Sequence, residues 1–294
     1  MTQLEAALEP ARLQEMDRYG RTSIYKRMED ALDDKNRRIL RLVNHGLTMV
    51  DDIIDNSDEP LTYLAQMQEL LGRTYSGQTL TSESPVEEAI TGLGTELHGM
   101  AQSFWTRGKA RVLYSLVLDY WKTEVTNFQR RERILPRAGL DPITKDIGSI
   151  IAMQFMMILD PPTDPFEFIN LCNAYGMAVK LADNLCDYRE DINAGFVNVP
   201  KEDIHHVTGL RIEGDRILEV ENSRLGLSRE YIEKEYGRIR DIFGSAEHRL
   251  LLVRAQRPLW DRRLHQRLKA FGDLCQAWHR QAKEFVASET KIAF

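Results

Sequence analysis

Apolar residues recur three and four positions apart along almost the whole chain of 294 residues. This spacing places side chains on one face of an α-helix, whereas the strict alternation typical of strands is nearly absent. Long helices are predicted over residues 36–56, 61–71, 86–105, 109–134, 145–159, 165–193, 229–256 and 258–287. Such a chain can bury its apolar surface only by packing helix on helix, which predicts an all-α fold.

Stretches rich in Gly, Pro and Ser separate the predicted helices. Residues 136–142 lie between two prolines and are expected to form a turn, and residues 195–227 are the longest stretch expected to be irregular. No repeat or shift in composition divides the chain, so we expect one domain over residues 1–294, with residues 1–20 as a peripheral N-terminal segment. A helix bundle with a central cavity is the natural architecture.

Composition and charge exclude several classes of protein. The net charge of -6 argues against a nucleic-acid surface, which would need a basic stripe. The N-terminus lacks the apolar region of a signal peptide, and the longest apolar stretch, near 147–159, is too short for a transmembrane anchor. The three cysteines form no CxxC pair, which fits a reducing compartment, so we expect a cytoplasmic protein. The oligomeric state is left open between monomer and homodimer.

Two acidic clusters interrupt apolar helical stretches. Because residues four apart share a helix face, Asp51 and Asp55 lie together in the first cluster. Asp183, Asp187 and Asp191 form a stripe over two turns in the second. Carboxylates at this spacing repel one another, and charge among apolar residues is costly unless it is paired or bound to metal.

A divalent cation would relieve this repulsion. Mg²⁺ prefers oxygen ligands and typically bridges one or two carboxylates to the phosphates of a substrate. Two such clusters facing each other across a helical cavity would therefore hold a metal and a diphosphate. The alternative is a pair of solvated acidic surfaces, and the apolar stretch before each cluster favours the site.

Three stretches resemble the squalene/phytoene synthase family. The family's second aspartate-rich region is similar to residues 181–200, LADNLCDYREDINAGFVNVP, and its first is similar to residues 44–60, NHGLTMVDDIIDNSDEP. Residues 21–38 lie where the family has a flap and the start of the next helix, and the order and separation of motifs agree over about residues 21–271. The resemblance implies the isoprenoid synthase fold and Mg²⁺-dependent ionisation of an allylic diphosphate to a carbocation.

The resemblance also implies roles for individual residues. The catalytic and metal-binding residues would be the two aspartate pairs, Asp51, Asp55, Asp187 and Asp191. Tyr25 would match an aromatic residue of the flap that lines the substrate pocket. Lys180 and Asp183 share the stripe of the second motif, and we expect both to contact substrate.

The chain departs from the family where the family carries arginines. Thr48, Cys186 and Phe196 occupy three such positions, and Lys180 and Asp183 replace a glutamine and an asparagine. Much of the positive charge that would hold a second diphosphate is therefore missing. Lys180 either replaces part of that charge or forms an ordinary salt bridge, and both alternatives stay open.

These departures favour a prenyltransferase, which transfers an alkyl group other than methyl, acting on an acceptor without a diphosphate. The donor would be a prenyl diphosphate of C5 to C20, and the acceptor an electron-rich small molecule, aromatic and carbazole-like, in secondary metabolism. The alternatives are head-to-head condensation of two prenyl diphosphates, class I terpene cyclisation, and a helical scaffold or lipid-binding protein without catalysis.

The carbocation and the prenyl chain need a dry, apolar pocket. Two or three aromatic residues should line it, from the candidates Phe104, Trp105, Tyr114, Tyr120, Trp121, Phe155, Phe168 and Tyr175. Gly148, Ser149 and Ala152 interrupt an apolar helix nearby in the sequence. They indicate either close helix packing or a kink that lets a hydrocarbon chain pass the backbone.

Overall fold

The computed structural model describes residues 21–56, 59–159, 165–258 and 260–290, and the side chains of residues 21–23, 45, 48, 49 and 51–56 are outside this description. The predicted N-terminal segment 1–20 also lies outside it. The described chain is one all-α domain with a short β segment, which confirms the predicted fold class. Its helices are α2 (Arg21–Asp30), α3 (Asp34–Asn56), α4 (Pro60–Tyr75), α5 (Pro85–Ala101), α6 (Arg107–Gln129), α7 (Arg137–Leu159), α8 (Pro165–Cys186), α9 (Tyr188–Asn193), α10 (Arg229–Ala255) and α11 (Arg262–Thr290).

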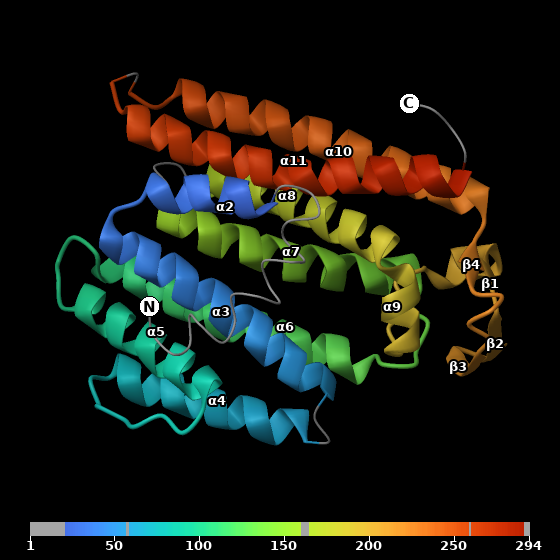
Figure 1. The fold of residues 1–294 in the computed structure, drawn as a ribbon, viewed down its shortest axis with the longest axis horizontal. Coiled ribbons are helices and arrows are strands. Elements are labelled where there is room, and N and C mark those ends of the chain that lie inside the picture. Colours follow the sequence, from blue (N-terminus) through green and yellow to red (C-terminus); the bar gives the residue numbers. More distant parts are fainter. Residues whose placement is uncertain (1–20, 57–58, 160–164, 259, 291–294) are drawn as a thin grey trace.

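The helices pack side by side around a continuous apolar core (Figure 1). Helices α10 and α11 lie along one edge of the bundle, and α4 and α5 lie along the opposite edge. Helices α7 and α8 pack against each other between these edges, and α8 also contacts α10 and α11. In the second acidic cluster, Asp183 lies near the C-terminal end of α8 and Asp191 lies in α9.

Two sequence predictions about element boundaries were wrong. The segment 136–142 is not a turn, since α7 begins at Arg137 and contains Pro142. A proline this close to the helix start removes one backbone hydrogen bond without ending the helix. Residues 195–227 are not irregular either. They form a 3-10 helix, η1 (Lys201–His206), and four short strands, β1 (Val207–Thr208), β2 (Leu210–Glu213), β3 (Arg216–Val220) and β4 (Gly226–Leu227).

Helices α7 and α8 touch through their backbones. Gly148 of α7 faces Gly176 of α8, and a Cβ added to either glycine would overlap backbone atoms of the other helix. Close helix packing is therefore the correct interpretation of the small residues near Gly148. The predicted passage for a hydrocarbon chain is excluded at this position, because the backbone of α8 fills the space.

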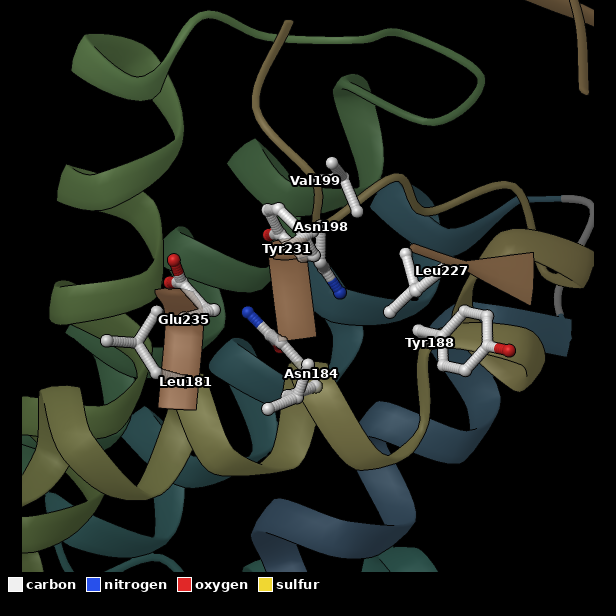
Figure 2. A pocket seen from close by; sticks show the side chains of 9 residues that line it. Leu181, Asn184, Tyr188, Asn198, Val199, Leu227, Tyr231 and Glu235 are labelled. Atoms are coloured by element: carbon white, nitrogen blue, oxygen red, sulfur yellow. The ribbon is translucent and has the colours of Figure 1, made fainter. Parts of the chain in front are cut away.

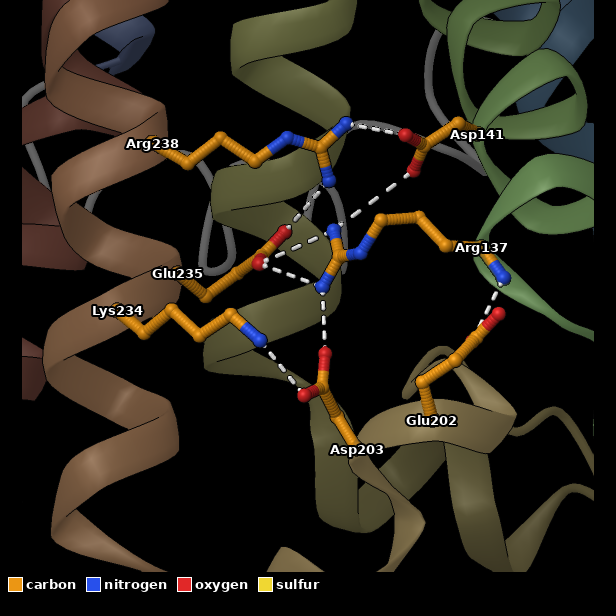
Figure 3. A network of polar contacts seen from close by, with 7 residues as sticks. All are labelled: Arg137, Asp141, Glu202, Asp203, Lys234, Glu235 and Arg238. Atoms are coloured by element: carbon orange, nitrogen blue, oxygen red, sulfur yellow. Dashed lines mark hydrogen bonds and ion pairs between the residues drawn. The ribbon is translucent and has the colours of Figure 1, made fainter.

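A network of ion pairs fixes η1 to α7 and α10 (Figure 3). Arg137 donates from Nη2 to Asp203 Oδ2 at 2.7 Å and contacts Glu235 Oε2 at 3.4 Å. Asp203 Oδ1 also accepts from Lys234 Nζ at 2.6 Å, and Arg238 donates to Glu235 Oε1 at 3.0 Å. The side chains of Asp203 and Glu235 are only 8% and 6% exposed. Burial disfavours their negative charges, and the ion pairs of the network compensate for it.

One helix in the described part of the chain, α7, is long and apolar enough to cross a membrane. Within its apolar window, 61% is buried against the rest of the bundle. The helix therefore gives no clear transmembrane anchor.

Replacing Gly176 with alanine should destabilise the fold, because the new Cβ would force α7 and α8 apart. Overpacking of this kind costs about 1–3 kcal/mol or more. The matched control is Gly244→Ala in α10, where a Cβ meets nothing within 4 Å. That change should stabilise the protein by up to about 1 kcal/mol through helix propensity. Urea unfolding of both variants measures the difference, and equal effects would contradict the close contact.

Replacing Arg137 with methionine should lower the free energy of unfolding by about 2–3 kcal/mol, because two buried carboxylates would lose their shared partner. The control is Arg229→Met, which removes an exposed ion pair with Glu233 on α10. Exposed pairs contribute about 0–1 kcal/mol. Urea unfolding near neutral pH compares the variants, and an Arg137→Met variant as stable as the control would show that the network is dispensable.

Candidate functional site

The second acidic cluster spans the junction between α8 and α9. Helix α8 ends at Cys186, yet the backbone N–H of Asp187 donates to Asp183 O and that of Asp191 donates to Asp187 O, each at 2.9 Å. These are the hydrogen bonds of a continuous helix. Asp183, Asp187 and Asp191 therefore lie along one side of the α8–α9 junction, and we call them the acid stripe.

Burial and mutual repulsion act on Asp187. Burial raises the pKa of its carboxyl group, and the carboxylates of Asp183, Asp191 and Glu190 raise it further. The ammonium of Lys180 opposes these effects, and the pKa is about 7. The carboxyl group of Asp187 is therefore only partly ionised near neutral pH, since close carboxylates cannot all carry full charge at low cost.

Asp191 is affected by opposing neighbours. Burial raises the pKa of its carboxyl group, Lys180 lowers it, and Asp183 raises it again. A hydrogen bond from Asn198 and the charge of Arg130 both lower it, and the pKa is about 6. The carboxylate of Asp191 thus has a hydrogen-bond donor and a nearby arginine that stabilise its charge. It is still harder to ionise than an exposed aspartate.

Lys180 lies within this field of negative charge. Its Nζ is 2.7 Å from Asp183 Oδ2, so the salt-bridge alternative is present in the structure. Burial lowers the pKa of the ammonium, but the carboxylates of Asp183, Asp191 and Glu124 outweigh burial and raise it. Lys180 is therefore fully protonated at neutral pH, and it partly compensates the acid stripe.

A buried arginine from another helix supports the same cluster. Arg130, which follows α6, donates from Nη2 to Asn198 Oδ1 at 2.6 Å, and Asn198 Nδ2 donates to Asp191 Oδ2 at 2.7 Å. The guanidinium carbons of Arg130 and Arg131 lie 5.7 and 5.8 Å from the ring centre of Phe196. Positive charge thus reaches Phe196 from the residues that follow α6. Arg130 and Asn198 are 68 residues apart in the chain, so their contact could not be predicted from the sequence.

A pocket is lined by residues of α8 other than those of the acid stripe, together with residues of the following loop and α10 (Figure 2). It encloses about 250 Å³ of empty space, part of it open to solvent, and is lined by Leu181, Asn184, Leu185, Tyr188, Asn198, Val199, Leu227, Tyr231 and Glu235. Asn184 is 7% exposed, and its Oδ1 has no hydrogen-bond partner in the described structure. Most of this space is open to solvent, and the enclosed part has room for only about one water molecule, so a long prenyl chain would not fit here. The predicted central cavity stays a prediction.

The first acidic cluster is on α3, which is helical through Asn56. The side chains of Asp51 and Asp55 lie outside the described residues. Figure 1 shows that α3 and α8 both end on the side of the bundle where α9 lies. The backbone arrangement therefore leaves the predicted pairing of the two clusters open as a prediction.

Tyr25 occupies a different part of the fold. Its side chain is buried in α2, and its hydroxyl donates to Leu40 O of α3 at 3.5 Å. Helix α2 is well separated from α9 along the long axis of the molecule (Figure 1). The structure therefore does not bring Tyr25 next to the acid stripe, and its role in a substrate flap stays a prediction.

Two of the eight candidates for the aromatic wall are excluded by their exposure, and the wall itself stays a prediction. Phe104 and Trp105 are 80% and 89% exposed, because they follow the end of α5 and point into solvent. Tyr175 packs edge-on against Phe243 and Phe271 in the core. The remaining candidates are buried or partly buried within the core: Tyr114, Tyr120, Trp121, Phe155 and Phe168.

The acid stripe offers carboxylate oxygens, the ligands that Mg²⁺ prefers. Among the side chains that the structure describes, no three His, Cys, Asp or Glu groups converge as a metal-binding cluster. Mg²⁺ at a phosphate-binding site, however, needs only one or two carboxylates, with water and phosphate completing its shell. Asp187 and Asp191 fit this requirement, because they offer oxygen donors whose mutual repulsion a cation would relieve.

Comparison of the sequence with protein-family models finds no match, and comparison with curated proteins finds none either. Function must therefore be argued from the chemistry of the site.

Replacing Asp187 with asparagine should stabilise the metal-free protein above pH 7, because the variant removes a repelled charge. The pKa of Asp187 rises from 3.8 to about 7 on folding. A raised pKa contributes stability below the unfolded value, and that contribution is lost as pH rises toward 7. The gain of the variant over the wild type should thus grow across this range and reach about 1–2 kcal/mol, allowing for partial exposure.

Urea unfolding in the presence of a chelator, at one pH below 5 and another above the Asp187 pKa of about 7, measures this difference. The control is Asp241→Asn, which changes an exposed carboxylate on α10. A stability difference for Asp187→Asn that does not change with pH would contradict the repulsion described for the acid stripe.

Proposed function

We propose that this protein is a Mg²⁺-dependent prenyltransferase related to the squalene/phytoene synthases. It would ionise an allylic diphosphate and transfer the prenyl group to an electron-rich small molecule, aromatic and carbazole-like. The acid stripe is the observation that carries the proposal. Its carboxylates are packed together at the end of a core helix, and burial together with the neighbouring carboxylates raises the pKa of Asp187 and Asp191, which is unfavourable unless a cation binds.

Each residue of the site has a role in this proposal. Asp187 and Asp191 hold Mg²⁺, with Asp51 and Asp55 of α3 as the second pair of ligands. When bound, the metal ion stabilises the negative charge that develops on the leaving diphosphate. Lys180 has three N–H donors, and besides its bond to Asp183 it can donate to a phosphate oxygen. Asp183 keeps the ammonium of Lys180 charged and oriented toward the stripe.

The nature of the acceptor follows from the charge that is missing. Thr48, Cys186 and Phe196 take the places where the family has arginines. Arg130 returns positive charge near Phe196, but all three of its nitrogens already donate to protein oxygens. A second diphosphate therefore has few cationic partners, which favours an uncharged acceptor over head-to-head condensation.

The proposal is tested by incubating the protein and Mg²⁺ with dimethylallyl, geranyl, farnesyl or geranylgeranyl diphosphate, with and without an electron-rich aromatic acceptor. We expect little pyrophosphate release from any donor alone and a prenylated product when the acceptor is added. Asp187→Asn and Asp51→Asn should each lower turnover by at least about 100-fold, because each removes a ligand that stabilises the leaving group. Asp241→Asn, on the exposed face of α10, should keep the activity of the wild type.

Other products would identify the alternatives. A C30 or C40 hydrocarbon from a single donor would show head-to-head condensation, and a cyclic terpene would show cyclisation. Either result would contradict the proposal of an aromatic acceptor and would still agree with the proposed metal site. An absence of pyrophosphate release under all conditions would contradict the enzymatic proposal and favour a non-catalytic scaffold.

A further inference from the structure

We infer that Arg130 and Asn198 are positioning residues, which fix the carboxylate of Asp191 through a chain of two hydrogen bonds that begins at α6. The inference rests on the proposed role of Asp191 as a metal ligand. It concerns residues outside both acidic clusters, and it assigns them a task in that site.

The direction of each hydrogen bond is fixed by chemistry. A guanidinium has only donors, so the oxygen of the Asn198 amide must face Arg130, at 2.6 Å from Nη2. The amide nitrogen then faces Asp191 and donates to Oδ2 at 2.7 Å. A flipped amide would place N–H groups against a cation and an oxygen against a carboxylate, so only one orientation satisfies both neighbours.

Arg130 is held rigidly in place. Its Nε donates to Asn127 Oδ1 at 2.8 Å and its Nη1 donates to Val197 O at 3.0 Å, while Phe196 covers the guanidinium at 5.7 Å. The side chain is buried, so it cannot swing out to bind a phosphate without breaking these contacts. Its function is therefore to orient Asn198 and not to contact substrate.

The backbone around Asn198 is fixed separately from its side chain. Arg131 Nε donates to Ala194 O at 2.7 Å, Glu132 N donates to Gly195 O at 2.7 Å, and Lys201 N donates to Leu135 O at 2.8 Å. Gly195 has φ = 91°, a conformation that L side chains rarely adopt, and this turns the chain back toward residues 130–135. Residues 194–201 thus stay docked on this connection when the Asn198 side chain is shortened.

The two oxygens of Asp191 therefore have different roles. Oδ2 accepts the bond from Asn198, which sets the plane and rotation of the carboxylate. Oδ1 would then be the oxygen left to hold a metal ion. Hydrogen bonds to metal-binding carboxylates fix the orientation of the ligand, and their removal typically costs about 10–100-fold in metal affinity.

The test measures Mn²⁺ affinity by electron paramagnetic resonance of the full chain, with Mn²⁺ as the probe for a Mg²⁺ site. Asn198→Ala should weaken binding about tenfold or more, because Asp191 loses its orienting bond. Asn222→Ala is the matched control. It makes the same substitution at an exposed asparagine in the connection between β3 and β4, away from the acid stripe, so it should bind Mn²⁺ as the wild type does.

A second measurement needs no variant. The side-chain amide resonance of Asn198 should shift on titration of the wild type with Mg²⁺, because its N–H group bonds to the carboxylate that binds the metal. If the wild type binds Mn²⁺ and Asn198→Ala binds it with equal affinity, the inference about Asn198 is wrong while the metal site stands. The same holds if the wild type binds Mg²⁺ and the Asn198 resonance does not shift. Wild-type protein that binds no Mn²⁺ would overturn the metal site of the proposed function, and the inference with it.

Discussion

Repulsion among the carboxylates at the end of α8 is the constraint on which this structure depends. Asp183, Asp187 and Asp191 lie along one side of the α8–α9 junction, and burial strengthens the repulsion. Only Lys180 forms an ion pair with the stripe among the described residues. Keeping such charges in a packed bundle lowers the stability of the folded state. Binding of a cation to these carboxylates would restore that stability.

Other contacts of the fold hold the α8–α9 junction in place. Gly148 and Gly176 bring α7 and α8 into backbone contact, which fixes the helix that carries the stripe. Arg137 ties η1 to α10 through Asp203 and Glu235, beyond the loop that follows α9. The connection after α6 holds the loop itself through backbone hydrogen bonds. Three independent contacts thus restrict the ways in which the carboxylates could move apart.

The all-α class and most helix positions follow from the sequence, since apolar periodicity over long segments has one physical interpretation. The acid stripe follows as well, because four-residue spacing survives the break at Asp187 through helical hydrogen bonds. The β segment was missed, although the pair Gly214-Asp215 joins β2 to β3 as a two-residue hairpin turn. Arg130 and Asn198 could not be predicted, because a single sequence does not show which distant polar residues meet. The exposed Phe104 and Trp105 show that aromatic type alone does not place a residue in a pocket.

The most direct test of the metal site is anomalous diffraction from crystals soaked in Mn²⁺ and pyrophosphate. We predict an anomalous peak within coordination distance of carboxylate oxygens of Asp187 and Asp191, with Asn198 still bonded to Asp191 and pyrophosphate lying toward Lys180. Crystals in which pyrophosphate and Mn²⁺ bind away from both aspartates, or in which no Mn²⁺ binds at the acid stripe at saturating concentration, would contradict the metal site.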